Sequence, residues 1–226
     1  MKFLVTRPLP AFALAALCLA AGSAFAAAAA PADFDTQLLS IQQQWAHVNY
    51  ELEDGDARDA AFDQLKARAA GFAKDNPARA EALVWKGIVE SSYAGAKGGL
   101  GALGLAKDAR ASLEASIKLD PKALDGSAYT SLGTLYAKVP GFPVGFGDDE
   151  KAEKLLRRAL ELNPQGIDPN YFYAEFLLDE GRGDEAIAYL ERAAKAPDRP
   201  GRETADRGRR AEIAALNSRL AAKSGH

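Results

Sequence analysis

The sequence predicts an all-α protein, a right-handed α-solenoid of about four helical hairpins followed by a C-terminal capping helix. A spacing of small, large and small residues recurs three times, and each copy ends at a proline. Each copy also follows a segment in which small and large residues keep helical spacing, as two closely packed helices require. No stretch shows the alternation with period 2 that is typical of a strand.

The first 26 residues have the features of a cleavable signal peptide. Lys2 and Arg7 make the start positive, and an uncharged apolar run follows at residues 11–21. Ala24 and Ala26 are the small residues that a signal peptidase reads. The run is shorter than the roughly 20 apolar residues of a spanning helix. We therefore expect cleavage after Ala26, a periplasmic location and no membrane span in the mature protein.

Cleavage would leave a disordered leader at residues 27–32 and one helical domain at residues 33–226. Cys18, the one cysteine, would be lost, so the mature chain would have no disulfide and no cysteine metal ligand. Removing Lys2 and Arg7 leaves 26 basic against 31 acidic residues, a net charge of −5. This mild acidity argues against nucleic acid as a partner.

The second helix of each hairpin should carry the recurring pattern. Its residues would pack on one helix face, and the proline would end the helix because it cannot continue the hydrogen-bond ladder. The three copies are Ala109, Leu113, Ser116 and Pro121; Ala152, Leu156, Ala159 and Pro164; and Ala186, Leu190, Ala193 and Pro197. Their partners in the first helices are Gly87 beside Trp85, Gly133 beside Leu132 and Tyr136, and Ala174 beside Tyr173 and Leu177.

The distance between the paired small residues varies along the chain. It is 12 residues from Ala174 to Ala186, 19 from Gly133 to Ala152 and 22 from Gly87 to Ala109. Relative to the shortest hairpin, the other two carry inserts of 7 and 10 residues, which we expect to be loops at the same end of the stack.

Two further elements complete the predicted stack. An earlier hairpin spans residues 34–74, with Trp45, Tyr50, Phe62, Leu65 and Phe72 as its apolar face. A last helix at residues 203–223 would turn Ile213, Leu216 and Leu220 inward and leave Arg207, Arg209 and Arg210 solvated.

Residues 95–105, 129–133, 140–148 and 168–173 together resemble a group of exported bacterial tetratricopeptide-repeat proteins. That group is similar to the T-component of TRAP-type transporters and to the helical domain of regulators of microtubule dynamics. The resemblance implies a tetratricopeptide-like solenoid with a non-enzymatic binding role. For the transporter relatives it implies a periplasmic solute pathway, and it brings no catalytic residues.

The first insert contains a formal G-x-G-x-x-G at residues 99–104. It follows a predicted helix rather than a buried strand, so it lacks the context of a dinucleotide site. Two interpretations stay open. In the first, the insert is a packed loop that buries Leu100, Leu103 and Leu105 beneath it. In the second, the insert forms the wall of an apolar pocket, with Lys97 at the mouth of that pocket.

The second insert is stiffened by Pro140 and Pro143 and offers Phe142 and Phe146 for burial. Asp148 should cap the next helix. Tyr171, Phe172, Tyr173 and Phe176 start the fourth hairpin, and we expect two of them in the core and the others on a binding shelf. The predicted contacts for a ligand or partner are Lys97, Leu100, Leu103, Phe142, Phe146, Tyr171 and Tyr173.

Catalytic candidates are few. The mature chain has only His47 and His226, so no histidine-based triad or metal site is predicted, and no cofactor. Glu90 with Ser91 and Ser92 faintly resembles lytic transglycosylases, although an exposed helix position explains this glutamate more simply. The leading hypothesis is a periplasmic scaffold for a peptide or protein; the alternative is a binding subunit for an apolar or carboxylate solute. The oligomeric state stays open.

Overall fold

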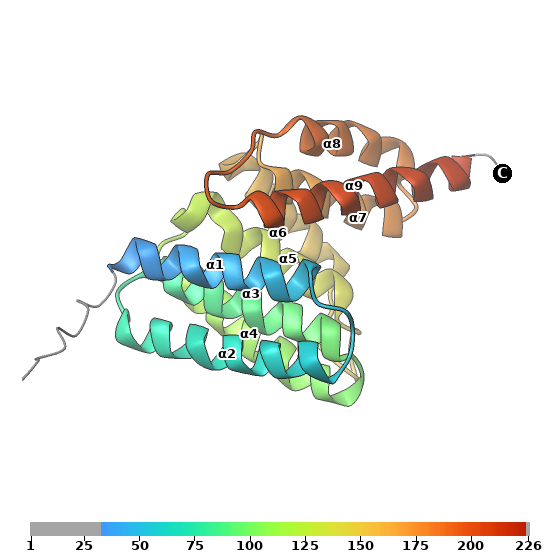
Figure 1. Cartoon of the computed structure of the whole chain (residues 1–226). Coiled ribbons are helices and arrows are strands. Elements are labelled where there is room, and N and C mark those ends of the chain that lie inside the picture. Colours follow the sequence, from blue (N-terminus) through green and yellow to red (C-terminus); the bar gives the residue numbers. More distant parts are fainter. Residues whose placement is uncertain (1–32, 225–226) are drawn as a thin grey trace, which may run out of the picture. The chain divides into compact units, whose positions relative to one another are not determined.

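A computed structural model describes residues 33–224, apart from the side chains of Leu100, Lys223 and Ser224. The predicted signal peptide and leader lie outside these residues. Within the described range the chain forms nine α-helices and one short 3-10 helix, with no strand, which confirms the predicted class (Figure 1). The elements are α1 (Phe34–Tyr50), α2 (Asp56–Asp75), α3 (Ala80–Lys97), α4 (Gly99–Leu119), η1 (Ala123–Gly126), α5 (Ser127–Lys138), α6 (Asp149–Leu162), α7 (Ile167–Asp179), α8 (Gly183–Lys195) and α9 (Glu203–Ser224).

The predicted hairpin register is confirmed. Helices α3 and α4, α5 and α6, and α7 and α8 pack as pairs. A Cβ added to Gly87 would lie 2.6 Å from Cγ of Leu113, and one added to Gly133 would lie 2.8 Å from Cγ of Leu156. The helices therefore approach closely because a small residue faces a large one at each crossing. The α1–α2 hairpin also forms as predicted, and Trp45, Phe62, Leu65 and Phe72 are buried while Tyr50 is half-buried.

The glycine-rich segment is not the predicted loop. Helix α3 continues to Lys97 and α4 begins at Gly99, so Gly98 alone joins them. Gly98 and Gly99 adopt φ of 61° and 59°, a left-handed backbone that glycine tolerates without steric cost. The chain reverses there, and the additional residues lengthen both helices instead of forming a loop.

The second insert is a loop between α5 and α6, as predicted. Asp148 caps α6, because its side chain accepts a hydrogen bond from the backbone N–H of Lys151 at 3.0 Å. Phe146 packs edge-on against Tyr136, with ring centroids 5.4 Å apart. Phe142 is 94% exposed, so its expected burial is wrong. It lies in the tight turn at the end of the loop, beyond the reach of the helices.

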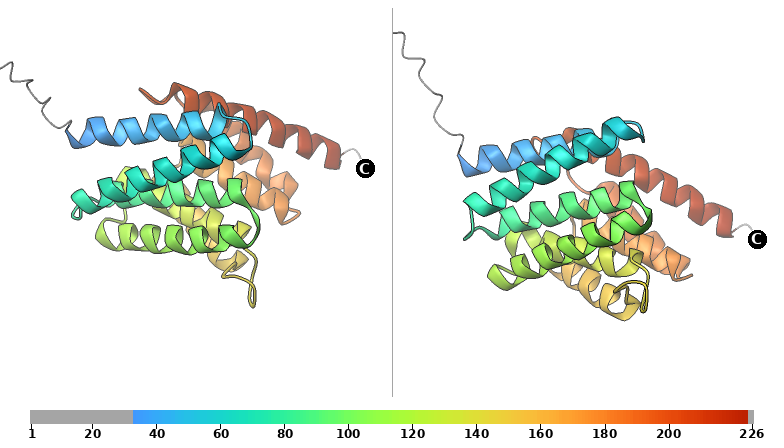
Figure 2. Two further views of the ribbon diagram at one scale, coloured as in Figure 1. Left: turned by 60° about the horizontal axis from the view of Figure 1, so that its bottom comes forward. Right: turned by 90° about the horizontal axis from the view of Figure 1, so that it is seen from below.

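Helix α9 buries Ile213, Leu216 and Leu220, as predicted. It packs against α8, but also against α7 and α1 (Figure 2). Arg209 is only 6% exposed, so its predicted solvation is wrong: the face of α9 that carries it meets α7 instead of water. Within residues 33–224, no helix is both long and apolar enough to cross a membrane.

Candidate functional site

A cavity of about 510 Å³ lies against the first helices of the hairpins, α1, α3, α5 and α7. The first turns of α4, η1, the loop between α5 and α6, the connection between α8 and α9, and α9 itself complete its wall. Leu103 and Ala102 come from the first insert, and Val139, Pro140 and Val144 from the second. The two inserts therefore contribute to one cavity.

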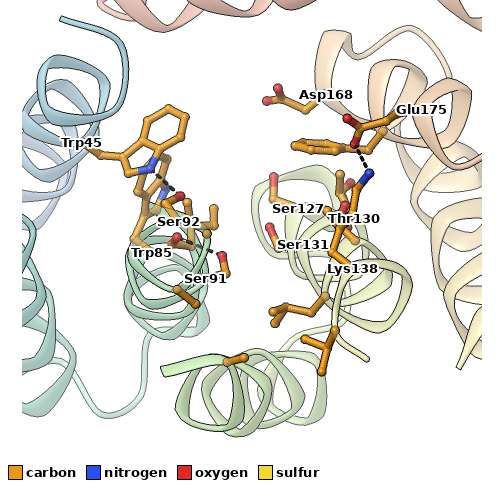
Figure 3. A pocket seen from close by; sticks show the side chains of 18 of the residues that line it. Trp45, Trp85, Ser91, Ser92, Ser127, Thr130, Ser131, Lys138, Asp168 and Glu175 are labelled. Carbon is orange, nitrogen blue, oxygen red and sulfur yellow. Dashed lines mark hydrogen bonds and ion pairs between the residues drawn. The ribbon is translucent and has the colours of Figure 1, made fainter. Parts of the chain in front are cut away.

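Two tryptophans form one side of the cavity. The ring centroids of Trp45 and Trp85 lie 5.7 Å apart, edge to face. Nε1 of Trp45 donates to Oγ of Ser92 at 2.8 Å. Nε1 of Trp85 is buried and has no hydrogen-bond partner among the described residues. Figure 3 shows both rings across the cavity from α5 and α7.

Helix α5 presents a polar stripe to the cavity. Ser127, Ser131, Thr134 and Lys138 are spaced by four, three and four residues, which places them on one helix face. The hydroxyl of Ser127 donates to the carbonyl oxygen of Leu124 at 2.6 Å, and that of Thr134 donates to the carbonyl oxygen of Thr130 at 2.9 Å. Because the rest of the lining is largely apolar, this stripe offers oriented hydroxyl groups to a ligand.

Lys138 ends the stripe and is held in place by two carboxylates. Its Nζ lies 3.3 Å from Oε2 of Glu175 and 2.6 Å from Oδ2 of Asp179. Burial lowers the pKa of Lys138, but the two carboxylates outweigh burial, so the pKa is raised overall. The lysine therefore stays protonated, and its positive charge is compensated by the two carboxylates.

Asp168 links α7 to the segment that follows α8. Its Oδ2 accepts from Nη1 of Arg199 at 2.6 Å, and its Oδ1 accepts from Nε of Arg209 at 2.8 Å. Burial raises the pKa of Asp168, but Arg209 and Arg199 outweigh burial and hold this pKa at about 2. Asp168 is therefore a carboxylate at all physiological pH values and fixes both arginines at the cavity wall.

The predicted contacts of the first insert are distributed between the cavity and its surroundings. Leu103 lines the cavity. The side chain of Leu100 lies outside the described residues. Lys97 is exposed away from the lining, and its Nζ donates to the hydroxyl oxygen of Tyr93 at 3.1 Å. Leu103 thus lies at the cavity wall while Leu105 is buried, and Lys97 does not lie at the predicted mouth.

The predicted aromatic contacts lie outside the cavity lining. Phe142 is exposed on the loop tip, and Phe146 packs on α5. Tyr171 and Tyr173 are 7% and 1% exposed and belong to the core instead of a binding shelf. Phe172 lines the cavity in their place.

The helical period explains this difference on α7. Asp168, Phe172 and Glu175 are spaced by four and three residues and share the face that lines the cavity. Tyr171 and Tyr173 point to neighbouring helices, where the hydroxyl of Tyr173 donates to Glu153 at 2.9 Å. The same spacing on α5 was readable in the sequence as a row of hydroxyl residues. No local pattern indicated that Arg199 or Arg202 reaches the cavity.

Glu90, the one candidate for acid catalysis, does not line the cavity. It is 4% exposed, lies 2.7 Å from Nζ of Lys86 and accepts a hydrogen bond from Ser112 at 3.0 Å. Its expected exposure is wrong, because α4 packs over this face of α3. Among the described His, Cys, Asp and Glu residues, no group of three or more is placed to hold a metal ion.

Fold and cavity together define a tetratricopeptide-like helical-repeat protein with a partly open cavity of about 510 Å³. A family model described as tetratricopeptide repeat matches residues 145–200, the region of α6 to α8. None of the curated proteins compared matches the chain. The chain is similar to the crystal structure of a thermophilic tetratricopeptide-repeat protein of Thermus thermophilus, at 21% identity and a TM-score of 0.55. The likeness covers 83% of this chain and 90% of that one, and it concerns the fold.

Proposed function

We propose that this protein works by binding and that its cavity holds a small organic molecule. The observation that carries the proposal is the cavity of about 510 Å³, with its apolar lining and the stripe of hydroxyl groups on α5. Pockets for small ligands typically measure roughly 300–1,000 Å³ and place a few convergent polar groups in an apolar wall. This cavity matches them in size and in chemistry.

The geometry favours a small molecule over a peptide helix along the inner face. Repeat solenoids commonly bind partners on an open concave surface. Here α9 packs against α1 and α7, and Arg199, Arg202 and Arg209 line the cavity. A peptide helix, about 10 Å wide with its side chains, would compete with α9 for this inner face.

Filling the cavity tests the proposal. Ala102 lines it from α4. We expect Ala102→Phe to abolish the binding of 1-aminoanthracene, a neutral fluorescent probe, because the added ring occupies the space of the ligand. Ala111→Phe on the exposed face of the same helix is the matched control and should bind the probe as the wild type does. Equal binding by both variants, with unchanged thermal midpoints, would contradict the proposal.

A second candidate function, docking of a protein partner, is favoured by the exposed loop tip. Phe142 is 94% and Val144 63% exposed, and Val144 also reaches the cavity lining. Exposed aromatic residues are frequent anchors of protein interfaces. We expect a photo-crosslinking residue at position 142 to give a discrete adduct in the producing cell. The same residue at Leu119, an exposed position on α4, should give none. Identical labelling at both positions would remove this candidate.

We further propose that the protein acts in the periplasm, within a solute pathway of the kind its T-component resemblance implies. The support is the basic, apolar and small-residue order of residues 1–26. N-terminal sequencing of protein from a periplasmic extract should begin at Ala27. Retention of Met1 would contradict export, and genes for a permease and a solute-binding protein nearby would favour the pathway.

A further inference from the structure

Arg202 is a cation in the cavity wall without an anionic partner. It lies in the connection from α8 to α9 and lines the cavity. Its Nε is buried without a hydrogen-bond partner, and its side chain joins none of the ion pairs formed within residues 33–224. Burial, together with the nearby Arg199, lowers the pKa of Arg202 to about 10, so the side chain remains charged at neutral pH. Arg202 as a residue is only partly buried, but its buried Nε is unfavourable without a hydrogen-bond partner.

The neighbouring arginines have taken the available carboxylates. Nε of Arg199 donates to Oδ1 of Asp206 at 2.6 Å, and its backbone N–H donates to Oδ2 at 2.7 Å. The two oxygens of Asp168 accept from Arg199 and Arg209. Both carboxylates are thus ion-paired with other arginines, and although their charge also acts on Arg202, that side chain forms an ion pair with neither.

The indole beneath Arg202 is unpaired as well. The guanidinium carbon of Arg202 lies 4.9 Å from the ring centroid of Trp85. Nε1 of Trp85 is buried without a partner among the described residues, whereas Nε1 of Trp45 donates to Ser92. Buried polar groups in native proteins are nearly always hydrogen-bonded. The guanidinium of Arg202, which lines the cavity beside this indole and forms no ion pair, therefore points to a ligand that accepts hydrogen bonds and carries negative charge.

We propose that Arg202 binds the carboxylate of an organic acid held in the cavity, an inference that rests on the proposed function. The planar guanidinium matches the two oxygens of a carboxylate. The indole of Trp85 supports the guanidinium from one face. The body of the acid lies against the apolar surface formed by Leu103, Leu135 and Phe172.

The charges of the cavity favour a monoanion over a phosphate. Among the cations of the described chain that line the cavity, Arg202 is the one without an ion pair, since Lys138, Arg199 and Arg209 each form one. Asp168 and Glu175 line the same cavity and would repel a dianion. A single carboxylate balances the single unpaired charge.

Matched pairs of acid and amide test the inference. The probes are 4-phenylbutyrate and decanoate, each compared with its primary amide, which keeps the shape and loses the charge. Intrinsic fluorescence reports on the cavity alone, because Trp45 and Trp85 are the two tryptophans of the chain and both line it. In the wild type we expect each acid to bind about tenfold or more tightly than its amide, as charge-assisted pairs are stronger than neutral ones.

Arg202→Gln should bring the affinity for the acids down to that for the amides and leave the amides unchanged. Arg202→Lys, which keeps the charge without the planar fork, should retain part of the preference. Arg207→Gln, on the exposed side of α9, is the matched control and should behave as the wild type does. Because Arg202 is unpaired, ligand-free Arg202→Gln should not melt below the wild type.

The outcomes separate the two proposals. Equal binding of acid and amide by the wild type would overturn the carboxylate subsite and leave the cavity proposal standing. A marked fall in the thermal midpoint of Arg202→Gln, with amide binding also lost, would make Arg202 a structural residue and overturn the subsite. If neither the four probes nor 1-aminoanthracene binds the wild type, both proposals are wrong.

Discussion

Replacing Arg209 with methionine is expected to lower the free energy of unfolding by about 3–5 kcal/mol, the usual cost of removing one partner from a buried ion pair. Arg209 is 6% exposed and bonds to Asp168 on α7 and to Glu212 on its own helix. Its guanidinium carbon also lies 4.5 Å from the ring centroid of Tyr171 and 4.3 Å from that of Phe172. Methionine fills part of the space but leaves both carboxylates with one cation fewer.

Urea denaturation followed by circular dichroism measures this change. Arg207→Met on the same helix is the control: its side chain is 67% exposed and pairs with Glu51 at the surface, so we expect a change of less than about 1 kcal/mol. Asp168→Asn combined with Arg209→Met should cost less than the two single changes added together, because the two residues interact directly. Equal midpoints for Arg207→Met and Arg209→Met would show that Arg209 is not a structural link between α9 and α7.

Gly133→Ala is expected to destabilise the protein by about 1–3 kcal/mol, because its methyl group would overpack a tight helix crossing. The added Cβ would lie 2.8 Å from Cγ of Leu156 and 3.2 Å from the carbonyl oxygen of Ala152, both on α6. Leu156 is fully buried in the core. The gain in helix propensity, about 1 kcal/mol, does not compensate.

Gly71→Ala is the matched control with the opposite expected sign. Gly71 lies inside α2 on the exposed face, and a Cβ there would meet no heavy atom within 4 Å. The change should stabilise the protein by up to about 1 kcal/mol. Thermal and urea midpoints of both variants measure the contrast. Midpoints that rise in both would show that the α5–α6 crossing is looser than the structure describes.

The helices and their pairing could be predicted from local sequence patterns. Ala109, Ala152 and Ala186 recur before a leucine at the same spacing, and all three are fully buried at helix crossings. Such a repeat is readable because the contacts within a hairpin are local and follow the period of 3.6 residues. Asp148 was predictable as a cap for the same reason, since its partner, the N–H of Lys151, is three residues away.

The glycine content of residues 95–104 led to a wrong prediction of a loop, because the chain needs glycine at only two positions to reverse its direction. Residues 95–104 hold five glycines, which favour a loop, yet only Gly98 and Gly99 reverse the chain. The other glycines are tolerated within helices because the hairpin packing of α3 against α4 outweighs the propensity cost of about 1 kcal/mol each.

The positions of the charged residues and the existence of the cavity depend on contacts between distant parts of the chain. Arg209 looks like a solvated position in the sequence of α9, and its partner Asp168 is 41 residues away on α7. Tyr50 and Glu212, which join α1 to α9, are 162 residues apart. Periodicity identifies the apolar face of a helix but not the helix that covers its polar face. The pairing of Arg199 and Arg209, and the isolation of Arg202 at the cavity wall, follow from long-range contacts that no local pattern contains.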